Sequence, residues 1–175
     1  GEVKVILHEV SKPYLNEELF SCRVVNEGKD IFLWSDRSGW GHYYHYSGEG
    51  KLLNAVTSGE WTAGRIMKID TEKKQIYLYG YGKEKGRNPN YTFAYRVGFN
   101  GKKITLLTPE NATHGVFIHL PGNLIVDNFS RIDTVPRISV RDGNGRLLTV
   151  LEEADVSKLL EYGWKFPEQF TVKAA

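Results

Sequence analysis

The residue types that could act as nucleophiles form no recognisable catalytic motif in this sequence. Serine hydrolases of the α/β type place their serine in a Gly-x-Ser-x-Gly turn, and no such turn occurs in the 175 residues. The single cysteine, Cys22, lies in a segment of alternating apolar residues, so we expect a buried structural thiol. One cysteine also excludes an intramolecular disulfide and any multi-cysteine metal site.

The histidines have spacings that work against a shared metal ion. His42 and His45 are three residues apart, and an odd separation on a strand places side chains on opposite faces. His114 and His119 fail the same test if their segment is extended. We therefore expect hydrogen-bonded histidines within strands, and the sequence predicts no metal site and no cofactor.

Adjacent carboxylates and abundant aromatic rings have structural explanations. Glu17-Glu18 precede a predicted strand and Glu152-Glu153 precede a predicted helix, where solvated charges are common. Most of the 4 Trp, 10 Tyr and 8 Phe lie inside predicted strands, where packing accounts for them. The net charge is only +2, and no basic stripe accompanies the aromatics, which argues against nucleic-acid binding. The residues alone thus predict a scaffold with no catalytic residues.

The apolar residues come in short runs, rich in β-branched and aromatic types, that are typical of strands. Turn-forming residues separate the runs: Asn100-Gly101 suits a type I′ hairpin, and Ser47–Gly50 and Asp142–Gly145 are similar. The sequence therefore predicts many short antiparallel strands. The clearest runs are 31–34, 43–46, 76–79, 91–97, 116–118 and 124–126.

The predicted strands group into three four-stranded units. The second strands of these units begin at residues 31, 76 and 124, so the spacings are 45 and 48 residues. A four-stranded unit that recurs every 40 to 50 residues or so is typical of β-propeller blades. A β-sandwich is the alternative, since its strands also recur every 8 to 12 residues or so. The regular grouping favours an all-β fold, a β-propeller fragment of three four-stranded antiparallel blades.

The end of the sequence differs from the repeated units. Val156, Leu159 and Leu160 have helical spacing, so we expect one short C-terminal amphipathic helix, capped by Asp155. A strand-like segment follows at 169–173. Because closed propellers usually need at least four blades or so, three blades leave open edges. We expect these edges to meet the rest of a larger ring or a second copy.

Two features bear on origin and location. The first residue is Gly1 and the only methionine is Met67, so we expect an excised piece of a longer protein. No apolar run approaches the 20 residues or so of a membrane-spanning helix, and no signal peptide opens the sequence. No membrane insertion is predicted.

Several motifs, in order along the chain, resemble the propeller of the dipeptidyl peptidase IV family, in the prolyl oligopeptidase group. Residues 32–44, FLWSDRSGWGHYY, have a strand ending in Ser, a polar turn, Gly-Trp and then His. Residues 56–61, VTSGEW, resemble a blade junction of the family. Further similar stretches are 107–110, 126–130 and 134–136 in the last blade and 150–170 at the crossing into the hydrolase domain. The resemblance covers nearly the whole chain.

This resemblance implies a part of a two-domain serine exopeptidase that releases N-terminal dipeptides with Pro or Ala second. The propeller ring would restrict access to slender peptide chains. The family's Ser, Asp and His would lie after Ala175 and its amine-binding acidic pair before Gly1, so no catalytic residue is assigned here. Family members carry aromatic and basic substrate contacts in a loop at the place of Lys12-Pro13-Tyr14, which makes Tyr14 the substrate-binding candidate. A periplasmic or extracellular location is also implied.

The expected domain organisation follows the three units. The expected partners are a peptide substrate, the missing hydrolase domain and remaining blades, and a second copy of the chain. The alternative function is a stand-alone β-repeat binding module, and a glycan-active enzyme would need convergent carboxylates that the strand order does not offer. The predicted divisions are 1–16 (the end of a preceding blade and linker), 17–57, 58–108 and 109–151 (three blades), and 152–175 (helix and crossing).

Overall fold

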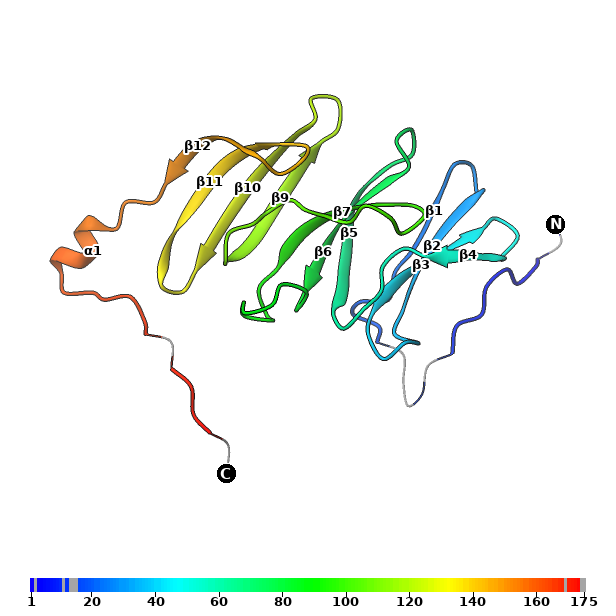
Figure 1. Ribbon diagram of the computed structural model, residues 1–175, viewed down its shortest axis with the longest axis horizontal. Helices are drawn as coiled ribbons and strands as arrows, with labels where there is room; N and C mark the ends of the chain where they lie inside the picture. The colour runs from blue at the N-terminus through cyan, green and yellow to red at the C-terminus, as the bar shows by residue number, and fades with distance from the viewer. Residues whose placement is uncertain (2, 11, 13–15, 169, 174–175) are drawn as a thin grey trace.

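The computed structural model describes residues 1, 3–10, 12, 16–168 and 170–173. Within these residues it contains twelve β-strands and one short α-helix (Figure 1). The strands are β1 (Cys22–Val25), β2 (Asp30–Ser35), β3 (His42–Ser47), β4 (Leu52–Ala55), β5 (Thr62–Asp70), β6 (Gln75–Tyr81), β7 (Phe93–Gly98), β8 (Thr105–Leu106), β9 (Thr113–His119), β10 (Leu124–Arg131), β11 (Thr134–Asp142) and β12 (Leu147–Glu153).

The strands form three separate four-stranded sheets, each an antiparallel meander in chain order. We call them blade 1 (β1–β4), blade 2 (β5–β8) and blade 3 (β9–β12). Figure 1 shows the three sheets standing side by side, with blade 2 in the middle. This arrangement confirms the all-β propeller fragment with one short C-terminal helix. The β-sandwich alternative is wrong, because each sheet is built from four consecutive strands and packs against its neighbour in the chain.

The second strands of blades 1 and 2 are buried on both faces. On β2, Phe32 and Trp34 face blade 2, whereas Ile31 and Leu33 pack into a smaller cluster on the opposite face. The same division holds on β6, where alternate residues face blade 1 and blade 3. Burial on both faces explains why these strands read as continuous apolar runs and not as an alternating pattern.

Two local predictions were wrong. Cys22 is exposed, because β1 lies at the edge of its sheet and its first three residues are exposed. The type I′ turn expected at Asn100-Gly101 is also absent, since only Gly101 of the pair has a positive φ. The pair of positive φ angles that this turn needs occurs instead at Asn26 and Glu27, in the β1–β2 turn.

The helix α1 (Ser157–Glu161) is shorter than its apolar spacing suggested. The N-cap residue is Val156, without a side-chain capping bond, and not the expected Asp155. Asp155 lies one position earlier, where its carboxylate accepts a hydrogen bond from the Ser157 amide at 2.9 Å. Leu159 and Leu160 remain about half exposed, and the helix buries none of its residues. Residues 170–173 form no strand. None of the helices in the described part of the chain has the length and apolar character to span a membrane.

Candidate functional site

The two blade-to-blade connections share one hydrogen-bond device. After β4, the Thr57 hydroxyl accepts a hydrogen bond from the Tyr43 amide at 3.2 Å. After β8, the Thr108 hydroxyl accepts one from the Ala94 amide at 2.9 Å. Both threonines are buried, so each hydroxyl replaces a strand partner that the shortened fourth strand no longer supplies. The repeated Val-Thr and Leu-Thr endings in the sequence therefore have a structural cause.

A second repeated device holds neighbouring blades together. Trp34, the fifth residue of β2, donates its indole N–H to the Ala63 carbonyl on β5 at 2.8 Å. Tyr79, the fifth residue of β6, accepts a hydrogen bond from the Val116 amide on β9 at 2.9 Å. In both cases a large side chain of the second strand reaches the first strand of the next blade. Gly41 is required here, because a Cβ at that position would lie 2.1 Å from the Trp34 ring.

The histidines in the strands are satisfied by hydrogen bonds. His42 lies 2.9 Å from both the Thr57 hydroxyl and the Gly59 carbonyl, at the connection between blades 1 and 2. Burial lowers the pKa of His42, although the bond to the Gly59 carbonyl opposes the shift. His45 contacts the Asp30 carboxylate at 2.6 Å on the opposite edge of blade 1. His42 and His45 therefore have separate partners, as their odd spacing suggested.

The connection between blades 2 and 3 contains a buried ionic cluster that we call the junction cluster: Glu110, His114, Asp127 and Arg141. Arg141 donates to Asp127 at 2.8 Å and to Glu110 at 2.5 Å. His114 Nδ1 lies 2.9 Å from the other Asp127 oxygen, and its Nε2 lies 2.9 Å from the Glu110 carbonyl oxygen. Asp127 is fully buried and Arg141 nearly so. Burial works against the charged form of Arg141, but its hydrogen bonds to Glu110 and Asp127 raise its pKa above the ordinary value.

Ligand atoms of Glu110, His114 and Asp127 lie within 4.8 Å of one another, a spacing that could hold a metal ion. Arg141 already supplies the positive charge at this place, because it bonds to both carboxylates. A His–Asp pair could also orient a general base. His114 and Asp127 are buried, however, and the described hydrogen bonds of the His114 ring run to the Asp127 carboxylate and the Glu110 carbonyl and not to a nucleophilic side chain. The cluster therefore fits a structural role at the blade junction.

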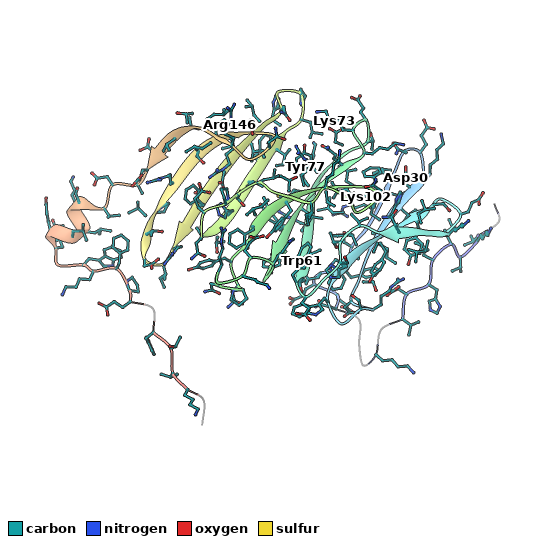
Figure 2. The ribbon with its side chains drawn as sticks, viewed as in Figure 1. Asp30, Trp61, Lys73, Tyr77, Lys102 and Arg146 are labelled. Carbon is teal, nitrogen blue, oxygen red and sulfur yellow. The ribbon has the colours of Figure 1, made fainter. Side chains whose placement is uncertain are left out.

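The upper rim in Figure 2 carries the turns between first and second and between third and fourth strands, with Asp30, Lys73, Lys102 and Arg146. A groove of about 670 Å³ lies there between blades 1 and 2, and four of its lining residues are lysines of the β5–β6 and β7–β8 turns. These lysines are exposed, as is usual for solvated rim residues. None of the four lysines that line the groove is buried.

The lower rim, where Figure 2 labels Trp61, carries the blade connections and the long loop between β6 and β7. Lys83 of that loop lies 5.8 Å from the centroid of the Trp61 ring. Glu84 accepts a hydrogen bond from the Tyr95 hydroxyl at 2.9 Å, and burial together with this carboxylate raises the pKa of Tyr95. The loop is therefore held against the blade by aromatic and polar contacts.

The structure describes some, but not all, of the candidate site residues considered from the sequence. Tyr14 lies outside the described residues, so its role stays a prediction. Glu17 and Glu18 are exposed, and Glu153 pairs with Arg137 at 2.5 Å. The junction cluster was missed, because its members are far apart in the sequence and meet only through strand pairing. The charged residues at 127 and 141, which lie within strands, are the signal that could have revealed it.

Comparisons with known proteins point to one family. The family described as the Dipeptidyl peptidase IV (DPP IV) N-terminal region matches residues 1–136. Dipeptidyl peptidase 4 of Trichophyton equinum is 28% identical over 183 aligned residues, which cover 98% of this chain and 24% of the relative. Dipeptidyl peptidase 4 of Arthroderma otae is 45% identical over 52 residues, 29% of this chain and 7% of the relative. The chain thus spans about a quarter or less of these relatives.

Solved structures show the same fold. The crystal structure of Porphyromonas gingivalis dipeptidyl peptidase 4 superposes with a TM-score of 0.72 at 20% identity, covering 91% of this chain and 22% of that one. A putative dipeptidyl aminopeptidase IV from Bacteroides ovatus gives a TM-score of 0.61 at 18% identity, covering 75% and 21%. At these identities the likeness establishes the architecture of the blades.

Proposed function

Because the chain belongs to the dipeptidyl peptidase IV N-terminal region family, we propose that it is part of the propeller of a serine-type dipeptidyl peptidase. The whole protein would release N-terminal dipeptides with Pro or Ala in second position. The observation that carries the proposal is the family match over residues 1–136, together with three consecutive blades in chain order. Relatives named dipeptidyl peptidase 4 that align over 98% of the chain support the same assignment.

In this proposal the segment is a scaffold that limits access and does not perform the chemistry. Its polar clusters are consistent with that role. The junction cluster lies at the connection between blades 2 and 3. Both ring nitrogens of His42 make hydrogen bonds at the connection between blades 1 and 2. Catalytic Ser, Asp and His would come from another part of the whole protein, and a closed ring would admit only extended peptides.

Hydrolysis of Gly-Pro-p-nitroanilide and Ala-Pro-p-nitroanilide tests the proposal. We expect the complete protein that contains this segment to cleave both substrates and to lose activity with a serine-directed reagent. The 175-residue chain alone should give no turnover. Serine-reagent-sensitive turnover by the chain alone, or none by the complete protein, would contradict the proposal.

We also propose that the isolated chain self-associates through its open blade faces. Phe117 on β9 is 66% exposed on the face of blade 3 that points away from blade 2. Light scattering should show dimers or larger species, and Phe117→Ser should shift them toward monomer. Ile132→Ser, at a similarly exposed residue in the β10–β11 turn, is the control and should change little. A clean monomer at high concentration would contradict self-association.

A location outside the cytoplasm is the remaining part of the proposal. It rests on the resemblance to exported peptidases. Fractionation of cells that express the complete protein checks it: recovery with periplasmic or extracellular markers is expected, and recovery with cytoplasmic markers would contradict it.

A further inference from the structure

Arg87, in the loop between β6 and β7, is a partly buried cation with no anionic partner among the described residues. Its guanidinium carbon lies 5.1 Å from the centroid of the Phe93 ring. Its Nη1 atom is buried and has no hydrogen-bond partner. A buried donor without an acceptor is costly, and in native proteins such a group calls for a specific explanation.

Arg131, at the end of β10, lines one pocket together with Arg87 but differs from it in its partners. Its Nε and Nη2 atoms donate to the two Asp133 oxygens at 2.7 and 2.5 Å. This two-bond pairing neutralises Arg131 within the chain. Of these two arginines, only Arg87 therefore carries a positive charge that no acidic side chain among the described residues pairs with.

Arg87 and Arg131 line a pocket of about 350 Å³ on the lower rim, which also contacts Asn88, Tyr91 and Asn111. The pocket is formed by the β6–β7 loop of blade 2, the connection into blade 3 and the end of β10. Among the described residues, its lining contains arginine, amide and phenol groups and no Asp or Glu. A site with these groups offers hydrogen-bond donors to a negatively charged ligand.

We propose that this pocket binds a carboxylate group, and that Arg87 is its principal partner. A planar carboxylate matches the fork of a guanidinium with two parallel hydrogen bonds. A carboxylate also carries one negative charge, which balances the one free arginine, whereas a phosphate dianion would leave an excess negative charge in the pocket. The carboxylate can belong to a small organic acid or to a peptide. The proposal concerns this chain alone and does not depend on the peptidase assignment.

Titration of the ¹⁵N-labelled chain, followed by amide NMR, tests the proposal with defined probes. Glutarate represents a free acid, and acetyl-Gly-Glu-Gly-amide represents a carboxylate carried by a peptide. Glutaramide and the Gln version of the peptide are the matched neutral probes. We expect saturable shifts of the amides of residues 86–88, 90, 91 and 111 with at least one acid and none with the neutral probes. The acid that binds more tightly identifies the source of the carboxylate.

Variants then assign the interaction to Arg87. Arg87→Gln should weaken binding at least tenfold, and Arg87→Lys should recover part of the affinity because it keeps the charge but not the fork. Arg131→Gln should weaken binding less, since Asp133 already neutralises Arg131. Arg65→Gln, at an exposed arginine of β5, is the control and should bind as the unmodified chain does.

Three results would overturn the proposal. They are equal shifts with acid and neutral probes, unchanged affinity in folded Arg87→Gln, and tighter binding of inorganic phosphate than of either carboxylate. If Arg87→Gln does not fold, the comparison of acid with neutral probes on the unmodified chain still decides the question.

Discussion

The two blade junctions solve the same packing problem with different chemistry. The interface between blades 1 and 2 is aromatic, with Phe32, Trp34 and Trp61 all buried in one cluster. The interface between blades 2 and 3 has a smaller apolar cluster and places the Arg141–Asp127 ion pair beside it. Both keep the same threonine hydroxyl at the end of the fourth strand. The backbone repeat therefore persists while the side chains that fill it change.

Because the two junctions differ in chemistry, we expect their stability to respond differently to substitutions. Apolar burial is non-directional, so an aromatic junction loses stability roughly in proportion to the surface and volume removed. A buried ion pair contributes little net stability when complete, but it becomes strongly unfavourable when one partner is lost. Substitutions at the two junctions therefore separate the two kinds of packing.

The largest effect is expected for Trp34→Ala at the aromatic junction. Removal of this fully buried indole leaves a cavity and deprives the Ala63 carbonyl of its donor. We expect a loss of about 4 kcal/mol or more in the free energy of unfolding, measured by urea denaturation. Trp40→Ala is the control, because Trp40 is 43% exposed and should cost about 1 kcal/mol or less. A loss at position 34 no larger than that at position 40 would contradict the packing described here.

Arg141→Met should have the next largest effect, at the ionic junction. It leaves Asp127 buried without its guanidinium, and we expect a loss of about 3 kcal/mol in the free energy of unfolding. The double variant Arg141→Met/Asp127→Leu should be more stable than the single one, since it removes the uncompensated charge. Arg146→Met, which breaks only an exposed pair with Asp142, should change stability by about 0.5 kcal/mol or less. A double variant that is less stable than Arg141→Met would argue against this account.

Thr57→Val and Thr108→Val should have smaller effects, and Thr57→Val the larger of the two, because the Thr57 hydroxyl also bonds His42 whereas the Thr108 hydroxyl bonds only the Ala94 amide. Each substitution leaves one buried strand amide without its acceptor, at a cost of about 1 to 2 kcal/mol. Chemical denaturation of both variants measures the two costs directly. A cost at Thr108 equal to or larger than the cost at Thr57 would contradict this assignment of hydrogen bonds.

The smallest expected effect concerns pH at the aromatic junction. The pKa of His42 is lowered in the folded state, so the unfolded chain binds the proton more readily. Its contribution to stability is present above the unfolded pKa, about 6.5, and is lost as the pH falls through the lower folded pKa. His42→Gln should flatten this part of the profile of unfolding free energy against pH. His8→Gln, at an exposed histidine, is the control and should leave the profile unchanged.

The repeating order of the fold could be predicted from the sequence because it follows from local patterns. The second strands expected from residues 31, 76 and 124 begin at 30, 75 and 124. Burial on both faces produces the continuous apolar runs of β2 and β6, which are easy to recognise. The prediction for Cys22 was wrong, because an alternating pattern does not say whether anything covers an edge strand.

The polar clusters could not be predicted, because they depend on which residues strand pairing brings together. Asp127 and His114 are 13 residues apart, and Arg141 and Glu110 are 31 residues apart. Only the register of β9, β10 and β11 places them in one buried site. Similarly, the missing partner of Arg87 is a property of the folded loop, since nothing in its local sequence distinguishes it from other loop arginines.

Structure determination of the complete protein tests the central claim most directly. The account predicts that residues 22–153 form three consecutive blades of one propeller ring, with the outer face of blade 3 covered by another part of the same protein. Two face-packed sheets with strands exchanged between them, or a ring that does not include these residues, would contradict it.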